Sequence, residues 1–430
     1  MQFSMTTKRK KKQHVISIPK EVVVEILRRV PCQDLCETLK KVCMHWCSII
    51  YSGSFAYSQI ERGISKSSSS FSQLEAVVVT RADDRRCVTI SALEWHSIPN
   101  YPFDEQEYWK TKYMFTKNDV FMDTLEPEIY MARAGSVNGF VCFWSSDARL
   151  HVSNPITKEY FTTPPYTTDI GSLYYIRRPA LLGFGFCHLS YEYKVVVLEN
   201  AGLLDGEIKP LVLTVGTDRS WRSLKAIPDR KFVAQFQIFG GVHVKGVLYW
   251  YMETCTLTEW LDNHANDRLK TLICFDVTKE DLVMIVVPIE NLEEKYVSIS
   301  IAEKGGKLCL ININYGPICS LLIELYIARN DIDDDLSSLN SWKKELTVTV
   351  PNMAYGMGVR HLFVLIVTDE IMVIRLNHDA TYGFFDVATG MLLGVHSLVR
   401  CATLVPFVPS LVSLFHRPPL FPLLNSSVRC

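Results

Sequence analysis

Residues 150–165 read LHVSNPITKEYFTTPP, and the same arrangement returns in LICFDVTKEDLVMIVVP at residues 272–288 and in YGFFDVATGMLLGV at residues 382–395. Each stretch is an apolar run, a short polar turn and a second run. Asn154, Asp276 and Asp386 end the first runs. Because an Asn or Asp side chain can hydrogen-bond the backbone of the turn that follows it, each stretch predicts a β-hairpin.

The spacing of these hairpins indicates a repeated unit. Asn154, Asp276 and Asp386 lie 122 and 110 residues apart (154 to 276 and 276 to 386), and the similar segments around Trp221 and Trp342 lie 121 residues apart. Each distance is close to three units of about 40 residues, the length of one four-stranded propeller blade. The sequence therefore predicts a degenerate β-propeller of roughly six to eight blades. Repeats of a β-sandwich are the alternative fold.

Changes of composition divide the chain. A serine-rich stretch, SKSSSSFS at residues 65–72, separates an N-terminal region of helical spacing from strand-length runs rich in β-branched and aromatic residues. The expected parts are a basic disordered leader at 1–16, an all-α module at 17–55, a linker at 56–73, a large all-β domain at 74–415 and an irregular tail at 416–430.

Charge and cysteine content bear on the binding partners and the cellular location of the protein. The net charge of −1 argues against broad electrostatic binding to nucleic acid or to a membrane. Residues 8–12, KRKKK, are either a nuclear-import signal or a solvated leader. The 13 cysteines lack the spacing of a disulfide framework, and no signal peptide or long apolar span is visible. We therefore expect a soluble protein of the cytoplasm, the nucleus or both.

The N-terminal module begins with SIPKEVVVEILRRVP at residues 17–31. Pro19 suits the first turn of a helix and Pro31 ends it. Asp34 is the expected N-cap of a second short helix, and a third follows around Trp46. About forty residues rarely bury enough apolar surface to fold alone, so this module predicts a partner. The apolar residues that recur at helical spacing in the first helix are Val22, Val23, Ile26, Leu27 and Val30.

This module resembles the F-box in its Pro, its Glu-x-x-x-Glu-Ile-Leu helix, its Val-Pro break and its Val-Cys-x-x-Trp helix. Met44 stands where the family commonly has Lys, and Gly53-Ser54 replaces the usual Pro before Phe55. The resemblance implies docking on the Skp-type adaptor of cullin-RING ubiquitin ligases, and through it on the cullin and RING subunits. Some of the implied contact residues pack the module's own core instead. These candidates are Ile18, Pro19, Val22, Ile26, Leu27, Val30, Pro31, Leu35, Val42 and Trp46.

The β region contains, in this order, GSVNGFVCFW (135–144), VSNPITKEYFTTPP (152–165), GFGFCHLSYEYKVVVL (183–198), SWRSL (220–224), HVKGVLYWY (243–251), ICFDVTKED (273–281) and SLVSL (410–414). These stretches resemble the successive signatures of the F-box-associated β-propeller domain of plant proteins. The resemblance implies a non-catalytic substrate-recognition subunit that selects a protein for ubiquitination and degradation. A protein-interaction scaffold outside ubiquitin transfer is the alternative. Gly183, Gly185 and Trp250 are interpreted as packing residues rather than binding groups.

Motifs for chemistry are missing from the sequence. No H-E-x-x-H, G-x-S-x-G or phosphate-binding loop occurs, so we expect no catalytic residue, no cofactor and no metal. Cys32, Cys36, Cys43 and Cys47 with His45 allow a zinc site as an alternative. Structural zinc sites favour two-residue gaps at a turn, whereas free cysteines are common in helix cores, which favours unliganded thiols.

Aromatic and arginine residues in three long inserts are the candidates for binding a target protein, because such residues supply most interface hot spots. They are equally suited to anchoring their own loops. These residues are Trp95, Trp109, Tyr174, Tyr175, Arg177 and Trp260.

Overall fold

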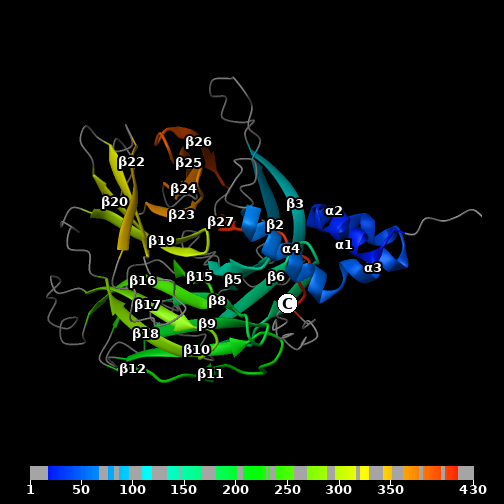
Figure 1. Ribbon diagram of the computed structural model, residues 1–430. Helices are drawn as coiled ribbons and strands as arrows, with labels where there is room; N and C mark the ends of the chain where they lie inside the picture. The colour runs from blue at the N-terminus through cyan, green and yellow to red at the C-terminus, as the bar shows by residue number, and fades with distance from the viewer. Residues whose placement is uncertain are drawn as a thin grey trace, which may run out of the picture.

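The computed structural model describes the chain as a helical head projecting from one side of a ring of β-sheets (Figure 1). The expected leader, the expected tail and several connections between strands lie outside the described residues. Those are 18–66, 76–81, 87–95, 109–118, 133–145, 147–166, 181–200, 207–228, 231–232, 239–255, 269–287, 296–315, 320–328, 342–350, 362–376, 381–398 and 402–414.

The head contains α1 (Lys20–Arg28), α2 (Cys32–Glu37), the 3-10 helix η1 (Leu39–Lys41), α3 (Met44–Ile50) and α4 (Gly53–Lys66). Pro19 and Pro31 are the N-cap residues of α1 and α2. The prediction that Asp34 caps the second helix is wrong, since Asp34 lies inside the first turn of α2. Helix α3 is capped by Cys43, whose Sγ accepts a hydrogen bond from the amide of Trp46. Helix α4 extends the head beyond residue 55.

The described strands form six sheets, numbered here as blades in chain order. Blade 1 contains β27 (Ala402–Pro406), β1 (Ala76–Arg81), β2 (Cys87–Trp95) and β3 (Trp109–Asn118). Blade 2 contains β4 (Arg133–Val137), β5 (Phe140–Ser145), β6 (Arg149–Asn154) and β7 (Glu159–Thr162). Blade 3 contains β14 (Phe239–Gly240), β8 (Leu181–Cys187), β9 (Glu192–Asn200), β10 (Glu207–Thr214), β11 (Arg222–Ser223) and β12 (Ile227–Pro228).

Blades 4, 5 and 6 consist of antiparallel strands. Blade 4 contains β13 (Lys231–Phe232), β15 (Val242–Val244), β16 (Val247–Cys255), β17 (Leu269–Asp276) and β18 (Asp281–Val286). Blade 5 contains β19 (Tyr296–Lys304), β20 (Lys307–Tyr315), β21 (Leu321–Ala328) and β22 (Trp342–Val350). Blade 6 contains β23 (Phe363–Val367), β24 (Ile371–Arg375), β25 (Thr381–Asp386) and β26 (Leu392–Ser397).

The ring is closed by pairing the two ends of the β domain. Strand β27, the last along the chain, pairs antiparallel with β1, so that Ala76 faces Pro406 and Thr80 faces Ala402. The inner strands β27, β4, β8, β15, β19 and β23 contact one another in that order, and β23 returns to β27. A closed ring of six blades is a β-propeller, which confirms that prediction and excludes the sandwich alternative.

The turns of the propeller divide between two faces. Because consecutive strands of a blade alternate in direction, the turns after the first and third strands lie on one face. The first turns of neighbouring blades do lie together. A Cβ on Gly246 would meet His188 of blade 3, and one on Gly306 of blade 5 would meet Lys245 of blade 4. The head contacts this face, through Ile156 and Tyr191, so it is called the head face. The opposite side is the far face.

The structure confirms the three repeated hairpins, but the prediction that three units separate one from the next is wrong. The Oδ1 atoms of Asn154, Asp276 and Asp386 accept backbone hydrogen bonds within the turn, the first from Ile156 at 3.0 Å. These residues end β6, β17 and β25, in blades 2, 4 and 6. Each spacing therefore spans two blades and not three. The predicted unit of about 40 residues is wrong, because long connections between strands enlarge the blades.

Packing between blades 3 and 4 explains two of the glycines. Trp250 of β16 is buried, and its Nε1 donates to the carbonyl of Leu182 in β8 at 2.7 Å. A Cβ on Gly183 would lie 2.4 Å from the Trp250 ring, and one on Gly241 would lie 2.8 Å from it. Both contacts are too short for a side chain. Gly183 and Trp250 therefore pack the two blades against each other, as the sequence predicted.

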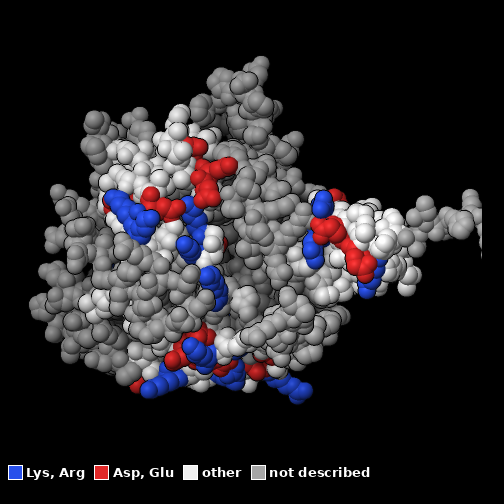
Figure 2. All heavy atoms as spheres, viewed as in Figure 1, with Lys and Arg blue, Asp and Glu red and all other residues white. Residues whose placement is uncertain are grey.

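Ion pairs connect blade 3 to blade 4 on the head face. Glu280, in the turn after β17, pairs with Lys194 at 2.8 Å and with Arg222 at 2.6 Å. Arg222 also pairs with Asp218 at 3.0 Å. The hydrogen bond from Arg222 is the main reason that the pKa of Glu280 falls to about 2. Figure 2 shows such groups of opposite charge side by side over the ring.

Candidate interaction surface on the helical head

Helix α1 places similar aliphatic side chains on two sides. Val23 and Leu27 are buried, whereas Val22 and Ile26 are 47% and 48% exposed. Residues four positions apart lie on the same side of a helix, so Val22 and Ile26 form one exposed row. Ile18, just before the helix, is exposed as well. Apolar side chains gathered in the open mark a contact surface, because burying them against a partner is favourable.

A second group of exposed apolar side chains surrounds α3. Val42 and Tyr51 are exposed, and Met44 is 86% exposed, the highest value among the large apolar residues described. Lys40 donates from Nζ to the Tyr51 hydroxyl at 3.2 Å, and this hydrogen bond raises the pKa of Lys40. The ammonium also lies 5.7 Å from the centre of the Tyr51 ring. The term head surface is used here for both groups together, namely Ile18, Val22, Ile26, Val42, Met44 and Tyr51; Lys40 adds a positive charge beside the second group.

The structure separates the predicted adaptor contacts into three groups. Leu27 and Leu35 have no exposed surface and pack in the core shared by head and ring. Val30 and Trp46 are half-buried against the same core. The exposed members are Ile18, Pro19, Val22, Ile26, Pro31 and Val42.

Two members of the head surface escaped the sequence prediction. Met44 was noticed only as a departure from the family pattern, and Tyr51 was not considered. The helical spacing of α3 offered a signal for Met44, since it lies on the side opposite the buried Ile49 and Ile50. Tyr51 follows the last residue of α3, where spacing gives no guidance.

The predicted target-binding residues fall on different parts of the ring. Trp95 ends β2 and Trp109 begins β3, and the two are cross-strand partners in blade 1, at the head face. Tyr174, Tyr175 and Arg177 belong to the connection between β7 and β8, and Trp260 to the connection between β16 and β17. These last four residues lie outside the described ones. Both connections start from strand ends at the far face.

One cluster superficially resembles a hydrolase triad. Ser145 Oγ lies 2.7 Å from His151 Nε2, while His151 Nδ1 lies 2.6 Å from the Tyr160 hydroxyl. The nearby carboxylate of Asp147 accepts a hydrogen bond from Ser145 rather than from the histidine. Ser145 has no exposed surface, so its hydroxyl cannot reach a substrate. The cluster joins β5, β6 and β7 and is structural.

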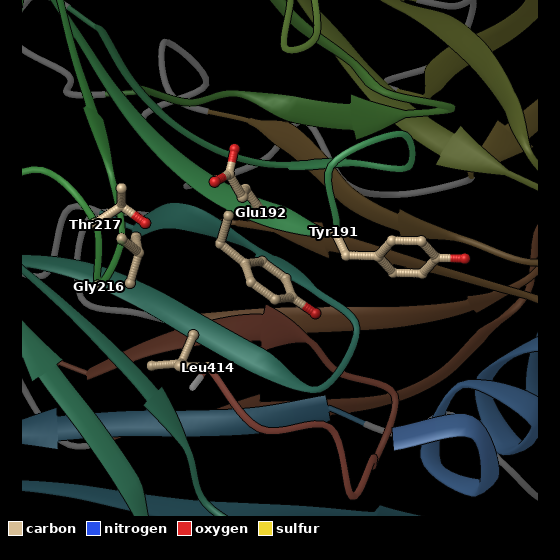
Figure 3. Close-up of a pocket in the computed structure, with 7 residues that line it drawn as sticks. Tyr191, Glu192, Gly216, Thr217 and Leu414 are labelled. Atoms are coloured by element: carbon tan, nitrogen blue, oxygen red, sulfur yellow. The ribbon is translucent and has the colours of Figure 1, made fainter. Parts of the chain in front are cut away.

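A small polar cavity lies on the head face of blade 3. It has a volume of about 110 Å³ and is lined by Glu192, Thr217 and Leu414 among others. In Figure 3 the Tyr191 ring points away from Glu192 and Thr217. That ring packs edge-on against Tyr57 of α4, with centroids 5.1 Å apart. The cavity is far smaller than the roughly 300–1,000 Å³ of sites for small molecules, and its size suits only a few water molecules.

The described residues contain no group of three His, Cys, Asp or Glu side chains arranged for a metal ion. The thiols of Cys32 and Cys36 instead make hydrogen bonds to oxygen atoms, and Cys43 caps α3. Among the same residues, no helix is long and apolar enough to cross a membrane.

Comparison with known proteins assigns the class that this architecture defines. The described strands form a six-bladed propeller, which is joined to a helical head with exposed apolar side chains. Residues 91–385 match the family described as the F-box associated beta propeller domain. The chain belongs to this family.

Relatives agree with the assignment. One protein of Arabidopsis thaliana named as an F-box protein is 26% identical over 72% of this chain and 68% of its own length. Another from the same plant is 22% identical over 94% of this chain and 100% of its own length. A solved chain of the nidogen/laminin complex is 12% identical, with a TM-score of 0.38 over 77% of this chain and 96% of that chain. This last likeness is too distant to add to the fold assignment.

Proposed function

We propose that this protein is the substrate-recognition subunit of a cullin-RING ubiquitin ligase of the SCF type. The head binds a Skp-type adaptor, which connects to the cullin and RING subunits, and the propeller binds a target protein. The observation that carries this proposal is the head surface, an apolar patch left open on a module whose other side is packed against the ring. Membership of the F-box associated family supports it.

The function is one of geometry rather than chemistry. A receptor that holds a target beside the ubiquitin-carrying partner raises the effective concentration of the reacting groups, and this accelerates transfer without a catalytic residue in the receptor itself. The target would be held by the connections that carry Tyr174, Tyr175, Arg177 and Trp260, or by Trp95 and Trp109 at the end of blade 1. Connections of a propeller suit this role because they vary without disturbing the blades.

The test is adaptor binding by the purified full chain. Val22→Asp combined with Ile26→Asp places two carboxylates on the head surface and should weaken adaptor binding by about a hundredfold, because central apolar contacts dominate interface free energies. The variant Ile18→Ala with Pro19→Ala tests the edge of the same patch. Val286→Asp is the matched control, since Val286 is 53% exposed but belongs to β18 of the ring.

The proposal is supported if wild type and Val286→Asp bind the adaptor strongly and the variant with Val22→Asp and Ile26→Asp does not. No adaptor binding by the folded wild-type protein would refute it. Adaptor binding without adaptor-dependent ubiquitination of any captured target would instead favour an interaction scaffold.

A further inference from the structure

The eight residues that follow β27 run along the head face instead of leaving the ring. Residues 407–414, called the strap here, pass from the inner strand of blade 1 to blade 2. Phe407, Leu411 and Val412 are buried in the apolar cluster that also contains Leu27 and Phe55 of the head. The strap therefore lies between the ring and the helices, in contact with both.

Asn154 binds the strap with its amide group. Its Nδ2 donates to the carbonyl oxygens of Ser410 at 3.1 Å and Val412 at 3.0 Å. Its Oδ1 accepts from the amides of Ile156 and Thr157 in its own turn. Asn154 has no exposed surface, and each of these bonds satisfies a buried polar group.

The corresponding turns of the other blades show why an amide is needed at this position. Asp276 accepts the same two turn hydrogen bonds with a carboxylate, and Asp386 accepts bonds from the amide and the hydroxyl of Thr389; both carboxylates are partly exposed. An ionised carboxylate accepts hydrogen bonds but cannot donate them. Only an Asn at this place can both close the turn and hold two carbonyl groups of another segment.

Further contacts hold the middle and the end of the strap. Ser410 donates from Oγ to the carbonyl of Asn138, in the first turn of blade 2. Gly139 in that turn leaves room for it, since a Cβ there would lie 2.3 Å from Ser410 Oγ. Further along, the Leu414 amide donates to Glu159 Oε2 at 2.9 Å. Blade 2 thus holds the strap from Ser410 to Leu414.

The head rests directly on this assembly. The Sγ of Cys32 in α2 lies 3.4 Å from the Pro409 carbonyl oxygen of the strap and 3.1 Å from Gln59 Oε1 of α4, so its single proton is available to either oxygen. One turn along α2, Cys36 donates to the carbonyl of Ile156 at 3.5 Å, in the turn that Asn154 closes. Helix α4 adds Tyr57, whose ring stacks on Phe186 of blade 3.

We infer that the strap is a positioning element that fixes the orientation of the head on the ring, and that Asn154 is the positioning residue that holds the strap. The head surface then faces outward in a fixed relation to the propeller. If the proposed function holds, the distance between a bound target and the adaptor is set by these contacts rather than by a flexible linker. The seating of the head does not itself depend on that function.

Thiol labelling of the full chain tests the inference. Cys32 touches the strap, whereas Cys43 is exposed and serves as an internal reference. Asn154→Asp keeps the acceptor for the turn but removes both donors to the strap. We expect the maleimide labelling rate of Cys32, relative to Cys43, to rise about tenfold, because two buried carbonyl groups lose their partners. Asp276→Asn makes the reverse change in blade 4 and should leave the ratio within about twofold of wild type.

The inference is supported if the labelling rate of Cys32 relative to Cys43 rises in Asn154→Asp but not in Asp276→Asn, and if Asn154→Asp still unfolds cooperatively. An unchanged ratio in the folded variant overturns it. If Asn154→Asp does not fold, Ser410→Ala decides, since it removes one strap contact and leaves Asn154 in place. A rise of about threefold there supports the inference and no rise overturns it. Labelling requires no adaptor, so this result is independent of whether adaptor binding is found.

Discussion

The head and the ring differ in how they bury their apolar side chains. The ring closes on itself, and Trp250, Phe275 and Phe384 in its blades have almost no exposed surface. The head buries one side of α1 against its own core and the ring and leaves Val22 and Ile26 open. The ring thus encloses its large aromatic residues, whereas the head keeps an open apolar row on α1, which the adaptor would cover if the proposed function holds.

The largest expected effect comes from a substitution in the ring, whose large aromatic residues are buried. Trp250→Ala removes an indole enclosed between blades 3 and 4 and one of the two donors to the Leu182 carbonyl, which keeps its bond from the Gly241 amide. We expect a loss of about 3–5 kcal/mol in the free energy of unfolding, measured by urea denaturation of the full chain. Val286→Ala in the same blade, at an exposed position, should cost less than about 0.5 kcal/mol. Equal effects of the two changes would contradict the packing described for this seam.

A pair of neighbouring substitutions tests the two sides of α1. Leu27→Ala opens a cavity in the shared core and should destabilise the head by about 2–4 kcal/mol. Ile26→Ala, on the exposed side, should change stability by less than about 0.5 kcal/mol. Hydrogen exchange of the amides of residues 20–28 reports the difference, as at least a thirtyfold faster exchange in Leu27→Ala. Similar exchange in both variants would show that α1 has no preferred buried side.

The pH dependence of the ring follows from the ion pairs of Glu280. Its pKa of about 2 in the folded protein lies below the roughly 4.3 of an unfolded chain. Its contribution to stability is therefore present above the unfolded pKa and is lost as pH falls towards the folded value. Glu280→Gln should flatten the fall in melting temperature between about pH 5 and pH 2.

Asp386→Asn is the matched carboxylate-to-amide change, in a turn whose carboxylate bonds to Thr389 rather than to a described cation. Its profile should fall in parallel with that of wild type. A Glu280→Gln profile that also follows wild type would mean that the ion pairs between blades 3 and 4 contribute nothing to stability.

The smallest expected effect sharpens the view of the head as an open surface. Met44→Ser removes the most exposed apolar side chain described on the head, and the melting temperature should stay within about 1 °C of wild type. Adaptor affinity should fall by about threefold, as for a contact at the rim of an interface. A large loss of stability with no change in affinity would mean that Met44 packs within the head instead.

The sequence predicted the turns better than the blades. The Asx turns at Asn154 and Asp276 follow from local chemistry, because the side chain bonds its own backbone. The blade count required the lengths of connections, which local patterns do not contain. Nothing nearby in the sequence distinguishes the amide of Asn154 from the carboxylate of Asp276, because the strap that Asn154 binds lies more than 250 residues further along the chain.

The prediction of adaptor contacts did not separate the buried side of α1 from its exposed side. Helical spacing places both Ile26 and Leu27 near an apolar face, and only the position of the ring shows that Leu27 is the covered one. Met44 and Tyr51 became visible because the packing of α3 leaves them outside.

The pairing of β27 with β1 has a consequence for synthesis. Blade 1 lacks its inner strand until residues 402–406 leave the ribosome, so the ring stays open until the other described strands have been made. The strap follows β27 directly. The head, which is synthesised before the ring, can therefore pack in its final position only after the strap has been made. A chain that stops short of the strap would expose the apolar sides of blade 1 and of the head together, which would mark it for chaperones and proteases. The chain must therefore be made at least as far as the strap before the head can take its final orientation.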